Sequence, residues 1–127
     1  MVVRFLLDSV ILIDHFNNIE AATNYLQQNW EEISISVITR AEVLAGFAPA
    51  DALIAAQLLD RFPNLEMTVQ VADLAATLRR QERWRLPDAI QAAFAQIHGL
   101  TLVTRNTRDF PPERYNFVLV PYQLGVN

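Results

Sequence analysis

The chain has 127 residues, of which 52% are hydrophobic and 19% charged. This is the composition of one ordered domain and excludes a disordered segment, while the absence of cysteine excludes disulfide bonds and thiolate metal sites. The net charge of −4 argues against broad electrostatic adhesion to nucleic acid, but a site whose acids bind cations is still allowed.

Short apolar runs rich in strand-forming residues alternate along the chain with longer segments of helical spacing. Nearly all-apolar strands between helices indicate a mainly parallel sheet that is covered on both faces. With no internal repeat or linker, the sequence predicts a single three-layer α/β/α domain over residues 1–127. We expect five strands, at 2–7, 33–37, 65–69, 100–104 and 117–120, and helices at 10–16, 19–30, 40–45, 49–61, 70–84 and 88–98.

Capping residues define the ends of several of these helices. Serine or threonine is favoured just before a helix, proline in its first turn and glycine just after it. In the helix that begins at Pro49, we expect the apolar residues 53, 54, 58 and 59 to lie on one buried side. The proposed N-caps are Ser9 and Thr39, the first-turn prolines are Pro49 and Pro87, and the proposed C-caps are Gly46 and Gly99.

The chain shows no sign of membrane insertion or export. Residues 1–8 are too soon interrupted by a charge to resemble a signal peptide, and no apolar run approaches the length of a membrane span. We therefore expect a cytoplasmic protein without a membrane partner. The high apolar content also favours a subunit interface.

Four acidic residues are expected at one end of the sheet. Asp8 ends the first strand, Glu42 lies early in the helix after the second, and Asp109 follows the fourth. Asp88 begins the helix that leads into the fourth strand, so the first turn of this helix returns to the same end. Four carboxylates there would repel one another unless cations lay between them, and oxygen ligands of this kind suit Mg²⁺ or Mn²⁺.

Taken singly, each acid also has an ordinary explanation as a cap, a turn residue or a solvated side chain. Ser9 and Thr104 lie beside the predicted site, where a hydroxyl could orient a metal-bound water or simply cap a turn. Asp14 is expected at the rim or in solvent. The two histidines, His15 and His98, lack ligand spacing and are expected to be structural.

All ten basic residues are arginine, and four of them fall within seven positions. Such a group is most often a solvated face, but it could also guide RNA phosphates toward the acids. The four residues are Arg79, Arg80, Arg83 and Arg85.

Four segments of the chain contain the acidic residues described above. They are FLLDSVILID at 5–14, ITRAEVLAG at 38–46, LPDAIQAA at 86–93 and GLTLVTRNTRDF at 99–110. Together these segments resemble the four sequence motifs of PIN-domain nucleases, and most of all those of the VapC-type toxins of prokaryotic toxin–antitoxin pairs. The resemblance spans nearly the whole chain in the right order. One departure is Val10, where the family often has asparagine.

The resemblance implies an endoribonuclease that uses Mg²⁺ or Mn²⁺ to hydrolyse RNA, a cognate antitoxin that blocks it, and a homodimer. Asp8 would be the central metal ligand, Asp88 and Asp109 would complete the metal site, and Glu42 would bind the metal or its water. The fourth motif also offers Asn106 as a ligand, but we expect Asp109 to bind the metal and Asn106 to support it, because Mg²⁺ prefers a carboxylate to an amide.

Two other classes share parts of this pattern. A phosphoacceptor receiver domain needs a lysine and adjacent acids after the first strand, and the chain has neither. A ribonuclease-H-type nuclease begins with antiparallel strands, which this sequence does not predict. A PIN fold that acts mainly through protein partners, with weak catalysis, stays open as the alternative.

Overall fold

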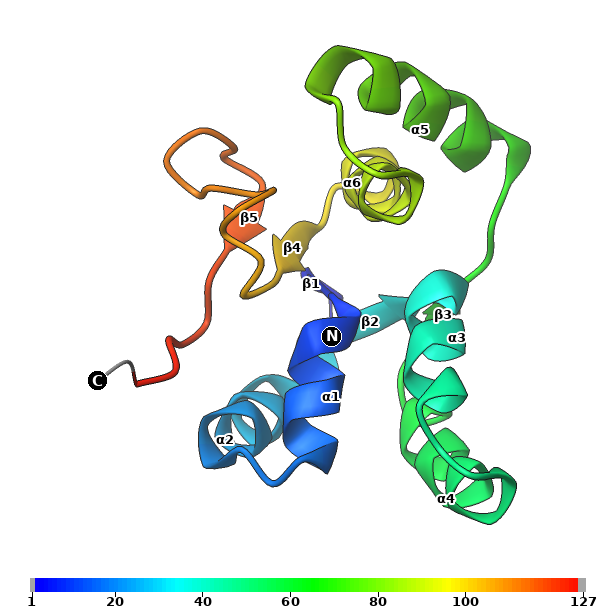
Figure 1. Cartoon of the computed structure of the whole chain (residues 1–127), viewed down its shortest axis with the longest axis vertical. Helices are drawn as coiled ribbons and strands as arrows, with labels where there is room; N and C mark the ends of the chain where they lie inside the picture. The colour runs from blue at the N-terminus through cyan, green and yellow to red at the C-terminus, as the bar shows by residue number, and fades with distance from the viewer. Residues whose placement is uncertain (1, 126–127) are drawn as a thin grey trace.

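A computed structural model describes residues 2–125 and places a five-stranded sheet at the centre of the molecule (Figure 1). The strand order is β3-β2-β1-β4-β5, and every neighbouring pair is parallel. The strands are β1 (Phe5–Leu7), β2 (Ile33–Ser36), β3 (Asn64–Leu65), β4 (Thr101–Val103) and β5 (Val118–Leu119). The helices are α1 (Ser9–Phe16), α2 (Glu20–Asn29), the 3₁₀ turn η1 (Trp30–Glu32), α3 (Val37–Ala45), α4 (Pro49–Leu59), α5 (Val69–Glu82) and α6 (Leu86–His98).

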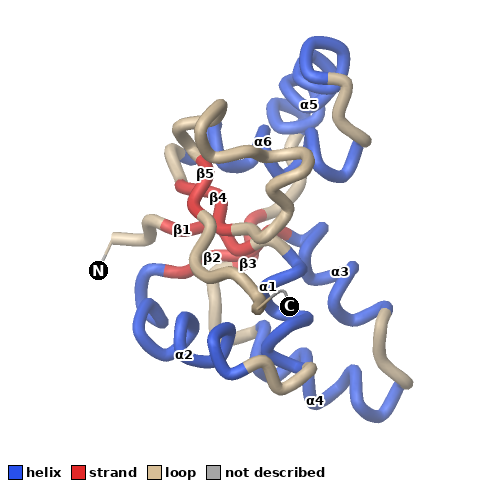
Figure 2. Tube along the Cα trace, turned by 60° about the vertical axis from the view of Figure 1, so that its left-hand side comes forward, coloured by secondary structure: helices blue, strands red, loops and turns tan. Residues whose placement is uncertain are grey.

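Helices cover both faces of the sheet, with α5 and α6 on one side and α1 to α4 on the other (Figure 2). Successive side chains of a strand point to opposite faces. In β1, Leu6 accordingly packs into the core under α5 and α6, whereas Phe5 and Leu7 pack into the second core with α1 and α2. The predicted three-layer architecture with a parallel five-stranded sheet is confirmed.

The register of the central strands fixes where the chain leaves the sheet. Leu7 lies opposite Val103 in the β1–β4 pair, and the Asp8 main-chain N–H donates to the Val103 carbonyl at 2.9 Å. The residues that follow β1 and β4 therefore lie side by side at the carboxyl end of the sheet.

The N-caps of two helices differ from the prediction by one or more residues. Asp8, not Ser9, caps α1, since its extended backbone precedes the helix and its side chain accepts from the Ser9 N–H. Ser36, not Thr39, caps α3 and accepts from the Thr39 N–H. Asp8 is the single residue between β1 and α1, and Ser36 is the last residue of β2, so in both places the cap is the extended residue directly before the helix.

The apolar side predicted for α4 is buried only in part, because Leu58 and Leu59 pack into the core but Leu53 and Ile54 do not. Leu53 and Ile54 are 72% and 66% exposed, whereas Ala55 and Leu59 are buried. Because α4 packs mainly against α3, only a narrow stripe of side chains, one helical turn long, is covered. Leu53 and Ile54 lie outside this stripe and remain exposed to solvent.

The third strand is shorter than predicted because Thr68 caps the next helix. The Thr68 hydroxyl accepts a hydrogen bond from the Val71 N–H at 3.1 Å, so α5 begins at Val69.

The two predicted C-cap glycines differ in backbone conformation. Gly99 ends α6 with the left-handed φ of 64° that favours glycine, whereas Gly46 ends α3 at φ −82°.

Among residues 2–125, no helix is long and apolar enough to cross a bilayer.

Candidate active site

Asp8 is held at the carboxyl end of β1 by neighbours on both sides of its carboxylate. The residue is 9% exposed. Its Oδ2 accepts a hydrogen bond of 2.7 Å from the Thr104 hydroxyl, and its Oδ1 accepts one of 2.9 Å from the Ser9 N–H. Ser9 and Thr104, which were selected from the sequence, both contact the Asp8 carboxylate, Thr104 through its hydroxyl and Ser9 through its main-chain N–H.

A buried polar network lies behind Asp8. The Gln91 side-chain amide donates to the Thr39 hydroxyl at 2.8 Å and makes a longer contact of 3.4 Å with Asp8 Oδ1. The Ser36 hydroxyl donates to the Gln91 carbonyl oxygen at 2.7 Å. Sequence reasoning missed this network, although Gln91 lies one helical turn after Asp88 and so on the same side of α6.

Asp88 lies in the first turn of α6 and is the most perturbed acid of the four. Its Oδ2 is buried and has no hydrogen-bond partner in the part of the chain that the structure describes. Burial, together with the negative charges of Asp109, Asp8 and Glu42, raises the pKa of Asp88 to about 6. Arg85, whose Nε lies 3.8 Å from Oδ2, acts in the opposite direction.

Glu42 lies on α3 and interacts with both Ser9 and Asp8. Its residue surface is exposed, yet lost hydration at the carboxylate raises its pKa, and the charge of Asp8 adds to this. A hydrogen bond with Ser9 and the charge of Arg85 act in the opposite direction. Glu42 therefore lies within the electrostatic influence of Asp8 and Arg85, as expected if the four acids lie at one site.

Asp109 is positioned by Asn106 and Trp84. The Asn106 amide donates to Asp109 Oδ2 at 3.0 Å, and the Asp109 N–H donates to Asn106 Oδ1 at 3.2 Å. The Trp84 indole N–H donates to the Asp109 carbonyl at 2.8 Å. Asn106 therefore supports the carboxylate of Asp109.

The four acids, called here the acidic pole (Asp8, Glu42, Asp88 and Asp109), influence one another electrostatically at the carboxyl end of the sheet. Within residues 2–125, no three His, Cys, Asp or Glu side chains stand close enough together to hold a metal ion as they are placed. The donor chemistry nevertheless fits a hard divalent cation, because it offers carboxylate oxygens, mutual repulsion and an unpartnered Oδ2 on Asp88.

Comparison with known proteins identifies the family of the chain. Residues 5–112 match the sequence model of the PIN domain. The chain belongs to the PIN-domain family. Ribonuclease VapC10 of Mycobacterium tuberculosis is 31% identical over 113 residues, which cover 84% of this chain and 85% of that protein.

Solved structures extend the likeness to VapC-type proteins. A toxin–antitoxin complex from Klebsiella pneumoniae contains a chain 34% identical to this one, with a TM-score of 0.86 and coverage of 94% of this chain and 98% of that chain. The DNA-bound VapBC of Salmonella typhimurium gives 25% identity, a TM-score of 0.75 and coverage of 86% and 91%. The VapC-type resemblance inferred from the four motifs is confirmed.

Asp14 of this PIN domain does not lie at the rim, and that prediction was wrong. It is 5% exposed and accepts hydrogen bonds from Arg105 at 2.6 and 2.8 Å and from the Tyr122 hydroxyl at 2.7 Å. The bonds from Arg105 hold the pKa of Asp14 below its ordinary value. This partly buried ion pair connects α1 to the segment that carries Thr104 and Asn106.

The arginine group of the PIN domain is divided by the structure. Arg79 donates to the Trp84 carbonyl at 2.9 Å and Arg80 to the Thr77 hydroxyl at 3.4 Å, so both make contacts around the end of α5. Arg83 ends this helix with a left-handed φ of 60°, and Arg85 lies beside Asp88.

Proposed function

We propose that the protein is an endoribonuclease that depends on Mg²⁺ or Mn²⁺ and acts as the toxin of a toxin–antitoxin pair, with the acidic pole as its catalytic site. The observation that carries the proposal is the state of Asp88. Its buried oxygen has no hydrogen-bond partner and lies in the field of three other acids, and the exposed Arg85 at 3.8 Å offsets their charge only in part, so a bound cation would relieve the repulsion.

The four acids would bind the cation, and the surrounding residues would hold them in place. The ion, when bound, supplies charge that polarises the phosphate and lowers the pKa of the attacking water. Thr104 and the Ser9 N–H orient Asp8, and Asn106 orients Asp109. The Glu42 carboxylate, with its raised pKa, is suited to accept a proton from the water, because a base closer to neutrality is the better general base.

The partners follow from the relatives. VapC10 is named a ribonuclease, and two similar structures are a toxin–antitoxin complex and a DNA-bound VapBC. For this chain we propose an RNA substrate in the cytoplasm, a small antitoxin and a homodimer. The exposed Leu53 and Ile54 on α4 offer apolar surface for such contacts.

We also propose that the PIN domain extends beyond the matched residues to the end of the chain. The segment after residue 112 supplies β5, which pairs with β4. It also supplies Tyr122, which donates to Asp14 of α1.

The test is cleavage of a mixed RNA pool by purified protein in Mg²⁺ or Mn²⁺, with and without EDTA. We expect EDTA to abolish cleavage and Asp8→Asn to reduce it by at least about a hundredfold, because the substitution removes a charged ligand with almost no change in volume. The matched control is Asp51→Asn, which removes an exposed carboxylate from the first turn of α4. Wild-type cleavage by Asp8→Asn, or cleavage that survives EDTA, would refute the proposal.

One observation favours the alternative of a PIN fold that works mainly as a binding module. The acids as placed in the described residues do not form a closed group of three ligands. Such a module would show no saturable Mn²⁺ binding, whereas the proposed nuclease requires it.

A further inference from the structure

A hollow of about 170 Å³ opens directly beside the acidic pole, with Asp109 in its wall. Three arginines line it, Arg83, Arg108 and Arg114, together with two acidic residues, Glu82 and Asp109. The hollow therefore carries net positive charge in a chain whose formal charge is −4. Such a local concentration of positive charge attracts an anionic nucleic-acid strand to a protein that is acidic overall.

The aromatic residues of the hollow are held in place by burial and by contacts with their neighbours. Trp84 is 5% exposed, its ring lies 5.2 Å from that of Tyr115, and its indole N–H is bonded to the Asp109 carbonyl. The hollow and the Asp109 main chain are thus linked through one buried side chain, so a group bound in the hollow has a fixed position relative to the acidic pole.

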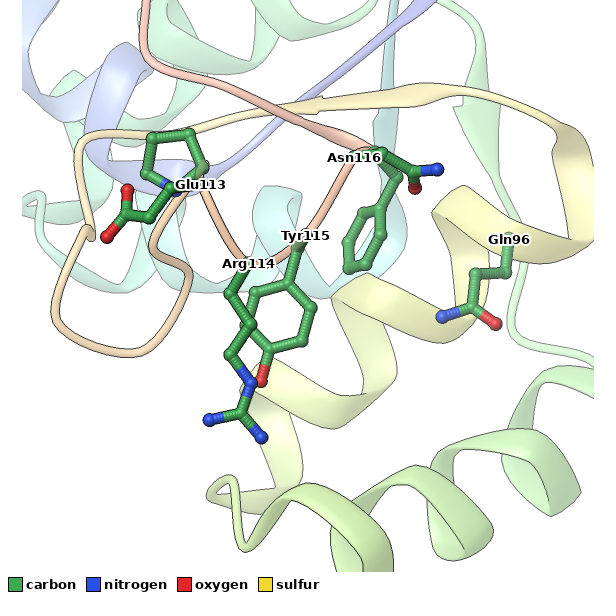
Figure 3. A pocket seen from close by; sticks show the side chains of 7 residues that line it. Gln96, Glu113, Arg114, Tyr115 and Asn116 are labelled. Atoms are coloured by element: carbon green, nitrogen blue, oxygen red, sulfur yellow. The ribbon is translucent and has the colours of Figure 1, made fainter.

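The charge of Arg114 is partly neutralised by a neighbouring carboxylate. Its Nη2 lies 3.4 Å from Glu82 Oε1, and the Tyr115 hydroxyl donates to the same oxygen at 2.6 Å. Figure 3 shows the Arg114 side chain beside the Tyr115 ring, while Glu113 points away from both. Arg114 also borders a larger hollow of about 510 Å³, which contains no member of the acidic pole.

Arg83 and Arg108 differ from Arg114 in one respect. Both are exposed, and within residues 2–125 neither guanidinium makes a hydrogen bond or an ion pair. Their charges are therefore available to a ligand. A guanidinium presents a planar fork of donors that matches the oxygens of a phosphate.

The backbone at Arg83 supplies a second, independent observation. Its φ of 60° is left-handed, and glycine is the usual residue at such a helix end, as at Gly99 with φ 64°. A bulky residue held in this conformation is unfavourable for the fold, and such strain is found preferentially where a side chain has a function.

We propose that this hollow binds phosphate groups of the RNA strand next to the scissile bond, chiefly through Arg83 and Arg108. The inference rests on the proposed ribonuclease function and specifies where its substrate lies. The arginines offset the repulsion between the acidic pole and the RNA backbone, and they fix the position of the strand without reading its bases.

The first test measures binding of a fluorescein-labelled 15-nucleotide single-stranded RNA by fluorescence anisotropy, in EDTA and over a series of salt concentrations. For single strands the slope of log K against log salt is about −0.7 per neutralised phosphate. Arg83→Gln combined with Arg108→Gln should therefore flatten the slope by about 1.4 and weaken binding at least about tenfold at low salt.

The matched control combines Arg4→Gln with Arg61→Gln, which removes the same charge from residues that precede β1 and β3, at the opposite end of the sheet. This control should leave the slope unchanged. An unchanged slope in the Arg83/Arg108 variant, an equal change in the control, or no RNA binding by the wild type would overturn the proposal.

The second test separates binding from folding. Arg83→Gly should raise the urea midpoint of unfolding, because glycine favours φ 60°, and should weaken RNA binding at the same time. A variant that is more stable and binds RNA as tightly as the wild type would overturn the role of Arg83.

Parallel cleavage assays in Mg²⁺ distinguish the two proposals. If the wild type cleaves RNA but the salt slope is unchanged in the Arg83/Arg108 variant, the proposed phosphate site is refuted and the proposed ribonuclease activity is supported. If the salt slope flattens in the variant but the wild type cleaves no RNA, the phosphate site is supported and the ribonuclease activity is refuted.

Discussion

Replacing Asp88 by asparagine should stabilise the metal-free protein at neutral pH. Folding raises the pKa of this carboxyl from 3.8 to about 6, and each tenfold change in an acid dissociation constant corresponds to about 1.4 kcal/mol. The ionised side chain therefore costs at most about 3 kcal/mol of folding free energy. The asparagine side chain carries no charge and so avoids this cost.

The sign of the pH dependence follows from the direction in which folding moves this pKa. Below the ordinary pKa both folded and unfolded chains are protonated at Asp88, so the charge has no effect on stability. The cost grows as the pH rises from about 4 through 6 and is complete above that range. The advantage of Asp88→Asn should therefore be largest near neutrality and should shrink as the solution is acidified.

Urea denaturation in EDTA between pH 4.5 and 7.5 measures this difference. We expect Asp88→Asn to be more stable than the wild type by about 1–3 kcal/mol at pH 7.5, or a melting temperature higher by roughly 3–10 °C. Asp51→Asn is a matched control, because Asp51 also lies in the first turn of a helix with an early proline but is exposed. An asparagine variant no more stable than the wild type at pH 7.5, or an advantage that persists unchanged at pH 4.5, would refute the reasoning.

Two further substitutions test the residues that hold the site together. Asp14→Asn should cost about 2–4 kcal/mol of unfolding free energy because it leaves Arg105 without its buried partner. Since the pKa of Asp14 is lowered by folding, this loss should diminish as the pH falls below about 4; a loss that is constant with pH in urea titrations would contradict the ion pair. Gln91→Ala should cost about 1–3 kcal/mol and slow RNA cleavage, since Ser36 and Thr39 lose their buried partner. Unchanged stability and cleavage rate would show the network to be unimportant.

The fold could be predicted from the sequence because its signals are local. Apolar strands such as residues 5–7, a first-turn proline at Pro87 and a glycine at Gly99 each determine their own segment, and the parallel order follows from their alternation. The position of Asp8 and Asp109 after parallel strands followed from the same rule.

What could not be predicted depends on contacts between distant segments. Asp14 looks like a solvated helix residue until Arg105, 91 positions later, is placed against it. Leu53 and Ile54 have the spacing of buried residues, but which side of α4 is covered depends on how it packs on α3. Gln91 became a candidate only when Ser36 and Thr39 were brought beside it.

A titration with Mn²⁺ tests most directly whether the acidic pole binds cations. Binding is measured as the loss of the free Mn²⁺ signal in electron paramagnetic resonance. We predict saturable binding by the wild type and by Asp51→Asn, and its loss in Asp8→Asn. Mn²⁺ binding that is absent from the wild type, or that is equally strong in Asp8→Asn, would contradict the account.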